Sequence, residues 1–397
     1  MILSNHPFNT RLAGLVLAIG FFCSCATTNV NVDALIADKD YDSALNAIEA
    51  ELEKNPNQPD LYYLKATING KLADHVSVSE RKPFYENMIE ALDETKTMAI
   101  EDTSFQDKVD NLALGYWTKE YNTGLKSYEA GSKNNVYDES IAHFKNSISL
   151  KPTEIKGYKS LSIAQYNSGD VDVAIATLNE ARFVVENEAE LFEDLGFLYL
   201  EVGNAEQSAY YYNLANTDIV KNKNVAFGLV NAYIAAENNA DALDLLNQLV
   251  NYYPKDAKLH NVYGTQLYNE ASSLFEELTA AYVTYDSSSV ESIKVEIEGV
   301  SELAEKEFIK AYSTDTSDVE FIESLAVFYN NMAGNYFSLM KTSFEEDNST
   351  IKGKALTLVD FAITYYNNLS ALAPQNDQID NKIRTLNTLK SSWAKTE

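Results

Sequence analysis

A repeated register in the centre of the chain constrains the fold most. Pro152 and Pro254 lie 102 residues apart, and Gly196 and Gly264 lie 68 residues apart, so both spacings are multiples of 34. The same period aligns one column of small side chains and one of large side chains, namely Ser140, Ala174, Ser208 and Ala242, and Phe144, Leu178, Tyr212 and Leu246. Self-similarity at a fixed period of this length predicts one supersecondary unit repeated along the chain.

The units have the pattern of helices. Short turns rich in Asn, Gly and Asp separate runs of about 12 or more residues with the helical period, and no run shows strict alternation of apolar and polar residues. The 397 residues include 15 Gly and 7 Pro, too few for a turn-rich sandwich or barrel. The sequence therefore predicts an all-α protein.

Glycine and proline mark where these helices end. Gly169 and Gly203 are predicted to form tight turns between the two helices of a unit. Proline stops a helix because it lacks a backbone donor and clashes with the preceding turn. The predicted stops after the second helix of a unit are Pro56, Pro152, Pro254 and Pro374.

A unit of 34 residues with two amphipathic helices resembles the tetratricopeptide repeat (TPR). The resemblance is strongest over residues 121–256, and it implies a right-handed solenoid of antiparallel helix pairs. We expect irregular repeats over residues 25–154, regular repeats over 155–256, and elongated helix pairs with a C-terminal cap over 257–397.

The predicted helices near the C-terminus are unusually long. One apolar pattern runs from residue 256 to about 285, about twice the usual repeat helix. A turn at the three serines 287–289 is predicted to precede its return helix. The remaining predicted helices span 319 to about 343, 352–372, and 377–395, the last being amphipathic and suited to capping a repeat array.

The first residues have the order of a secretory signal. Arg11 precedes the apolar run 12–22, which is too short to span a bilayer, and Cys23-Ser24-Cys25 follows it. This arrangement resembles a bacterial lipobox, which implies removal of residues 1–24, lipidation of Cys25, and an outer-membrane anchor facing the periplasm. Lipidation of Cys23, or an ordinary cleaved signal, is the alternative.

Composition excludes several functions. The 31 basic and 59 acidic residues leave a net charge of -28, which disfavours nucleic acids and anionic membrane surfaces. The chain has four His, none in a metal-binding spacing, and it lacks metalloprotease, serine-hydrolase, phosphate-loop and EF-hand motifs. We therefore expect no cofactor, no metal and no enzymatic activity.

The TPR resemblance implies a concave groove lined by the first helix of each unit. Twelve residues occupy the groove positions: Lys159, Ile163, Tyr166, Glu193, Phe197, Leu200, Phe227, Asn231, Ile234, Asn261, Thr265 and Tyr268. Aromatic and amide side chains suit an extended peptide or a partner helix. Ile163 stands where an Asn would help to clamp an acidic chaperone tail, so that clamp is absent. Packing against neighbouring helices is the alternative role for these residues.

These features predict a scaffold that recruits other envelope proteins or peptides. The alternative is an accessory lipoprotein of a solute uptake system, in which the long helices between residues 257 and 345 wall a ligand pocket.

Overall fold

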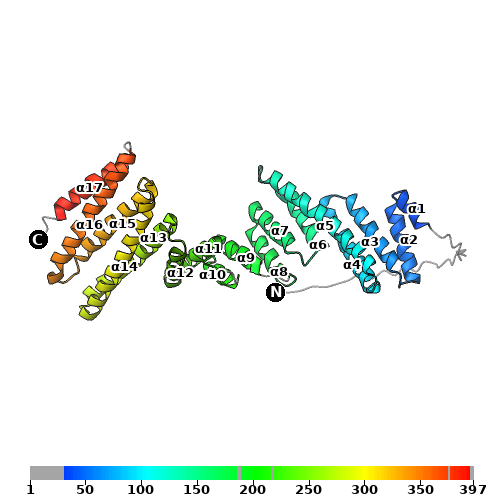
Figure 1. The fold of residues 1–397 in the computed structure, drawn as a ribbon, viewed down its shortest axis with the longest axis horizontal. Coiled ribbons are helices and arrows are strands. Elements are labelled where there is room, and N and C mark those ends of the chain that lie inside the picture. The colour runs from blue at the N-terminus through cyan, green and yellow to red at the C-terminus, as the bar shows by residue number, and fades with distance from the viewer. Residues whose placement is uncertain (1–30, 186–188, 216–217, 374–375, 394–397) are drawn as a thin grey trace, which may run out of the picture. The chain divides into compact units, whose positions relative to one another are not determined.

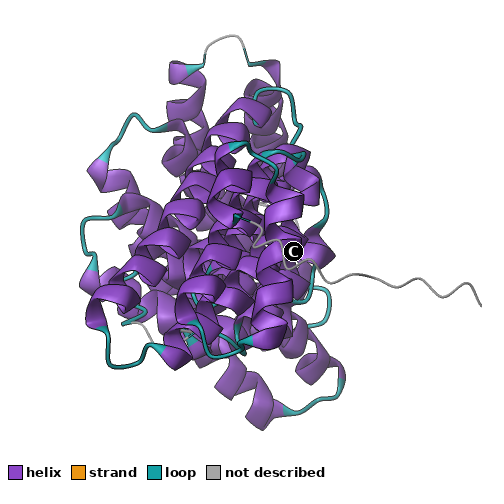
Figure 2. Ribbon diagram, turned by 90° about the vertical axis from the view of Figure 1, so that its right-hand side faces the viewer, coloured by secondary structure: helices purple, strands orange, loops and turns teal. Residues whose placement is uncertain are grey.

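The computed structural model confirms the all-α prediction. It describes residues 31–185, 189–215, 218–373 and 376–393, and these contain α-helices and one 3-10 turn but no strand (Figure 2). The predicted signal peptide, with Cys23 and Cys25, lies outside the described residues.

The chain divides into two compact units, Met1–Tyr116 and Trp117–Glu397, and the boundary lies within α5. In the first unit α3 packs along α4, and Ile48 and Ile68 belong to a small core between α2 and α3. The helices that begin in this unit are α1 (Val32–Ala37), α2 (Tyr41–Lys54), α3 (Pro59–Asp74), α4 (Lys82–Met98) and α5 (Thr103–Gly131).

The second unit is a solenoid of helix pairs (Figure 1). From α6 onward each helix packs mainly against the helices before and after it in the sequence, as expected of repeats. The short helices are α6 (Asp138–Leu150), α7 (Ile155–Ser168), α8 (Val171–Ala181), α9 (Ala189–Glu201), α10 (Ala205–Leu214), α11 (Lys223–Ala235) and α12 (Asn239–Tyr252). The long ones are α13 (Ala257–Val283), α14 (Ser287–Thr314), α15 (Val319–Leu339) and α16 (Glu345–Leu372), followed by α17 (Asp377–Trp393).

The two predicted columns form the interior of the short pairs. All eight residues of the small and large columns are buried. A Cβ added at Gly196 on α9 would lie 2.8 Å from Tyr212 Cγ, and one at Gly228 on α11 would overlap the outer end of the same ring. Glycine is therefore required where the Tyr212 ring inserts between α9 and α11.

Helix starts are fixed by polar caps. Side chains of Asn204, Asn222 and Asn238 accept hydrogen bonds from the backbone N–H groups of Gln207, Val225 and Asp241 at 3.2, 3.4 and 3.5 Å. Asp256, Asp286 and Asp318 cap α13, α14 and α15 in the same way. These contacts satisfy backbone donors that have no partner within the helix.

The predicted helix ends are confirmed. Helices α2, α6, α12 and α16 each end two residues before a proline of the predicted set, although Pro374 itself lies outside the described residues. Gly169 and Gly203 adopt positive φ values of 95° and 75° after α7 and α9. Both are therefore the left-handed turns that glycine favours.

The long helices are confirmed, but two predicted boundaries were wrong. The serines 287–289 do not form a turn; they begin α14, because Asp286 caps its N-terminus and Tyr285 makes the turn with φ of 57°. Helix α16 begins at Glu345 rather than at residue 352, because three acidic residues in its first turn favour a helix N-terminus. No described helix is both long and apolar enough to cross a membrane. The division into repeat segments 25–154, 155–256 and 257–397 stays a prediction.

Candidate functional site

The predicted groove residues lie on the first helices of four successive pairs. Lys159, Ile163 and Tyr166 are on α7, the next three are on α9, and the last six are divided between α11 and α13. Ile163 and Phe197 leave 45% and 41% of their surfaces exposed, and Asn231 on α11 is also exposed. Helices α7, α9 and α11 therefore present side chains from the predicted set to solvent.

Side chains connect α7 to α9 across this surface. The Lys159 ammonium lies 3.5 Å from a Glu190 carboxylate oxygen and 3.3 Å from one of Asp194. The ring of Tyr166 packs edge-on against Phe197 with centroids 5.3 Å apart, and its hydroxyl donates to Glu201 at 2.8 Å. The two helices thus share an aromatic contact flanked by polar contacts.

Two carboxylates on α9, near the aromatic pair, have raised pKa values. Burial raises the pKa of both Glu193 and Asp194, and the positive charge of Lys159 opposes that rise. The hydrogen bond to Glu201 raises the pKa of Tyr166, so this phenol stays protonated and donates. Asn222 donates to Glu193 at 3.2 Å and links the end of this surface to α11.

The remaining residues on α9 and α11 are mostly half-buried. Leu200, Phe227 and Ile234 pack against the large core cluster of the second unit, and only Asn231 projects freely among the groove positions of α11. At the start of α11, Lys223 forms an ion pair with Asp256. Each of α7, α9 and α11 thus exposes one of its three groove residues and leaves the other two half-buried.

The three predicted residues on α13 have a different setting. Asn261 is 7% exposed, while Thr265 and Tyr268 line a hollow of about 320 Å³ together with Phe308 and Phe328. The rings of Tyr268 and Phe328 meet edge-to-face at 6.0 Å. On α13 the groove positions thus contact the neighbouring long helices, as in the alternative packing role.

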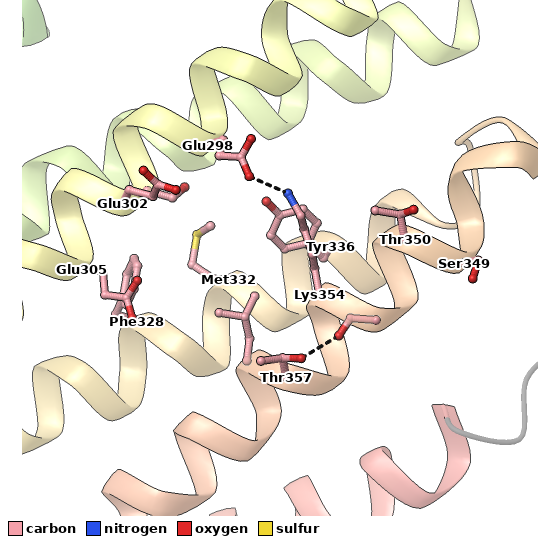
Figure 3. Close-up of a pocket in the computed structure, with 13 residues that line it drawn as sticks. Glu298, Glu302, Glu305, Phe328, Met332, Tyr336, Ser349, Thr350, Lys354 and Thr357 are labelled. Carbon is pink, nitrogen blue, oxygen red and sulfur yellow. Dashed lines mark hydrogen bonds and ion pairs between the residues drawn. The ribbon is translucent and has the colours of Figure 1, made fainter.

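A larger hollow of about 430 Å³ lies between α14, α15 and α16, and sequence reasoning did not identify its residues (Figure 3). Glu298, Glu302 and Glu305 come from α14, and aromatic and thioether side chains come from α15. Glu298 pairs with Lys354 of α16 at 3.1 Å, and Glu305 accepts a hydrogen bond from Tyr329 at 2.5 Å. The spacing of the three glutamates, which places them on one helix face, was the available signal.

A smaller hollow of about 270 Å³ adjoins it and shares Glu298, Tyr336 and Lys354 as lining residues. Asp347, which also lines the smaller hollow, accepts hydrogen bonds from Lys294 at 2.8 Å and from Tyr282 at 2.7 Å. Burial alone would raise the pKa of Asp347, but these bonds and the charge of Lys294 outweigh it and lower the pKa.

Two histidine–glutamate pairs are buried elsewhere. His143 Nδ1 lies 2.7 Å from Glu120, and His260 contacts both Glu307 and the Pro254 carbonyl oxygen. Each pair joins two adjacent helices inside the array. Among the described residues, no cluster of three or more His, Cys, Asp or Glu side chains could hold a metal ion.

Antiparallel helix pairs that repeat every 34 residues, with small and large columns buried between them, make this a TPR-type array. No protein-family model matches the chain, and no curated protein sequence matches it.

Solved structures are similar in fold. YrrB, described as a TPR protein with an unusual peptide-binding site, is 15% identical over 61% of this chain and 97% of its own, with a TM-score of 0.37. PilF of Pseudomonas aeruginosa is 12% identical over 68% and 97%, with a TM-score of 0.39. A TPR protein of Bacteroides fragilis is 17% identical over 60% and 99%, with a TM-score of 0.32. At these identities the likeness concerns the fold alone.

Proposed function

We propose that this protein is a non-enzymatic scaffold that binds an extended peptide or a helix of a partner protein along α7, α9 and α11. The observation that carries the proposal is the Tyr166–Phe197 pair, with Ile163 exposed on the same helix as Tyr166. Rigid helices hold these apolar side chains in solvent, and large aromatic groups supply contact area at low entropic cost.

Polar groups around the pair suit a protein ligand. The Asn231 amide is exposed and can both donate to and accept from a peptide backbone. Lys159 is already paired with Glu190 and Asp194, so it is not a free cation for an acidic tail. The proposed ligand is therefore apolar and aromatic in its anchoring side chains.

We also propose that the protein acts in the cell envelope. The signal-like order of residues 1–25 supports an outer-membrane anchor at Cys25 on the periplasmic side, and other envelope proteins are the proposed partners. A lipid on Cys25 would keep the groove within reach of such partners.

The test is capture of a partner from detergent-solubilised envelopes after brief crosslinking, with a Cys25→Ala variant carrying an exchanged signal as background. Phe197→Asp places a charge in the aromatic pair and should reduce capture by at least about tenfold, since it removes an apolar anchor. Phe183→Asp is the matched control, because Phe183 is 87% exposed and lies outside the groove positions.

Circular dichroism should show unchanged helicity in both variants. Capture that survives Phe197→Asp, or that falls equally with Phe183→Asp, would contradict binding at the groove.

A second candidate function is ligand binding by an accessory lipoprotein of solute uptake. The hollow of about 430 Å³ between α14, α15 and α16 supports it, because small-molecule sites commonly enclose about 300 to 1,000 Å³. A ligand that binds only the folded protein would raise its thermal stability.

A further inference from the structure

The larger hollow combines excess negative charge with an apolar wall. We propose that it binds a small organic cation, with an ammonium or guanidinium group facing Glu302 and Glu305 and an apolar body lying against Tyr336 and Leu358. This inference rests on the second candidate function and does not depend on the groove.

The charges of the hollow are not balanced. Three carboxylates, from Glu298, Glu302 and Glu305, line it together with a single ammonium group, that of Lys354. Lys354 pairs with Glu298, whereas in the described part of the chain Glu302 and Glu305 have no lysine or arginine partner. Tyr329 donates a hydrogen bond to Glu305, but this neutral phenol does not balance a carboxylate charge. A cationic ligand would complete this site, and an anionic one would be repelled.

The apolar wall suits the same class of ligand. Two lining residues, Tyr336 and Leu358, are half-buried and so present apolar surface to the hollow. The other two apolar lining residues, Phe328 and Met332, are almost completely buried and contribute little surface. Lys354 already stands over the Tyr336 ring at 5.8 Å, which shows that an aromatic face of this hollow accepts a cation.

A polar group in the wall is left without a partner. The Ser301 hydroxyl oxygen is buried and has no hydrogen-bond partner within the described residues. A buried polar group without a hydrogen bond costs free energy. A ligand whose N–H or O–H group donates to the Ser301 hydroxyl would remove this cost and bind more tightly.

The ends of the hollow limit the ligand's length. Glu298 and Lys354 line both hollows, and their ion pair crosses from α14 to α16 where the two adjoin (Figure 3). A small molecule fits within the larger hollow without breaking this pair, whereas a longer chain would have to displace it.

Methionine labelling gives a local test on the full chain. Met332 is a lining residue of the hollow, while Met88 lies in the other compact unit. With 13C-methyl methionine, titration with 2-phenylethylammonium should shift the Met332 signal, identified by its loss in Met332→Leu, and leave Met88 unchanged. The uncharged 2-phenylethanol should bind at least about tenfold more weakly, and phenylacetate should not bind.

Charge-removing variants test the proposed carboxylates. Glu302→Gln combined with Glu305→Gln keeps the side-chain shapes and should weaken binding of 2-phenylethylammonium by at least about tenfold, to the level of 2-phenylethanol. Glu296→Gln is the matched control, since Glu296 is exposed on the same helix but does not line the hollow. It should bind like the parent protein, and all variants should keep their melting temperatures.

Each other outcome overturns the inference in a distinct way. Equal binding of the cation and the alcohol would keep a small-ligand site but refute the cationic class. A Met332 signal that no probe shifts would refute the hollow as a site and the second candidate function with it, while leaving the groove proposal intact. A shift caused only by a lysine-containing peptide would replace the small ligand with a protein partner.

Discussion

The short pairs α7 to α12 and the long pairs α13 to α16 use the same packing rule with different results. In both regions a glycine of the first helix receives an aromatic ring of the second: Gly196 receives Tyr212, and a Cβ at Gly264 would lie 3.1 Å from Phe308. The repeat register therefore continues from the short pairs into the base of the long ones.

The regions differ in what the extra length adds. Helices α7 to α12 have 10 to 14 residues, which suffices for one interface with each neighbour and leaves their first helices facing solvent. Helices α13, α14 and α16 have 27 or 28 residues, and their added turns lie outside the repeat columns. The smaller hollow and the ion pairs of Lys294 and Lys354 lie in those turns, whereas the larger hollow also reaches Glu305, one helical turn from Phe308. Lengthening a repeat pair thus adds hollows that stay partly open to solvent.

The largest expected effect tests whether the two regions unfold separately. Leu178→Ala removes a fully buried side chain from the core of α7 to α10 and should cost about 2 to 5 kcal/mol of unfolding free energy. Because repeats contact only their neighbours, hydrogen exchange should accelerate in α7 to α10 and much less in α13 to α16. Urea unfolding followed by exchange mass spectrometry measures both.

Leu372→Ala is the control for this substitution, because Leu372 is half-exposed at the end of α16 and should cost far less. An equal gain in exchange across α13 to α16 in Leu178→Ala would show that the two regions unfold as one.

A smaller effect tests the shared glycine rule. Gly196→Ala places a Cβ against the root of the Tyr212 ring, which Gly228 confines from the other side, and should cost about 1 to 3 kcal/mol despite the higher helix propensity of alanine. Gly299→Ala meets no atom within 4 Å on α14 and should stabilise by about 0.5 to 1 kcal/mol. Thermal unfolding of the two variants should therefore shift in opposite directions. Shifts in the same direction would contradict the idea that both regions depend on an aromatic ring packed against a glycine.

The smallest expected effect on stability concerns the ion pair between Lys294 and Asp347, which joins two of the long helices. The pKa of Asp347 is lower in the folded protein than in the unfolded chain, so its carboxylate stabilises the fold above the unfolded-state pKa, and this contribution is lost as the pH falls through the folded-state pKa. Asp347→Asn should cost about 1 to 2 kcal/mol at pH 7 and progressively less below about pH 4. Urea unfolding across this pH range provides the measurement.

Glu346→Gln is the control, since Glu346 is exposed in the same helical turn and should change stability by less than about 0.5 kcal/mol. A loss in Asp347→Asn that does not vary with pH would assign the effect to packing instead of charge.

The helices that carry the predicted groove residues followed from the sequence, whereas the contacts of these residues did not. That these residues form a binding groove stays a prediction. A 34-residue frame places Tyr166 and Phe197 at corresponding faces of successive first helices, yet their edge-on contact depends on the distance between α7 and α9. The same frame extended to α13 places Asn261 at a groove position, where the structure buries it. The 34-residue repeat pattern does not indicate which residues the long helices bury.

The sequence by itself determined the helices, their pairing, their proline and glycine ends, and the residues buried between them. These features depend on local periodicity and backbone chemistry, which neighbouring residues encode. Only the tertiary structure decided which carboxylates remain unpaired and where space is left. The walls of the larger hollow come from the three helices α14, α15 and α16, and the space between them is set by how closely those helices pack.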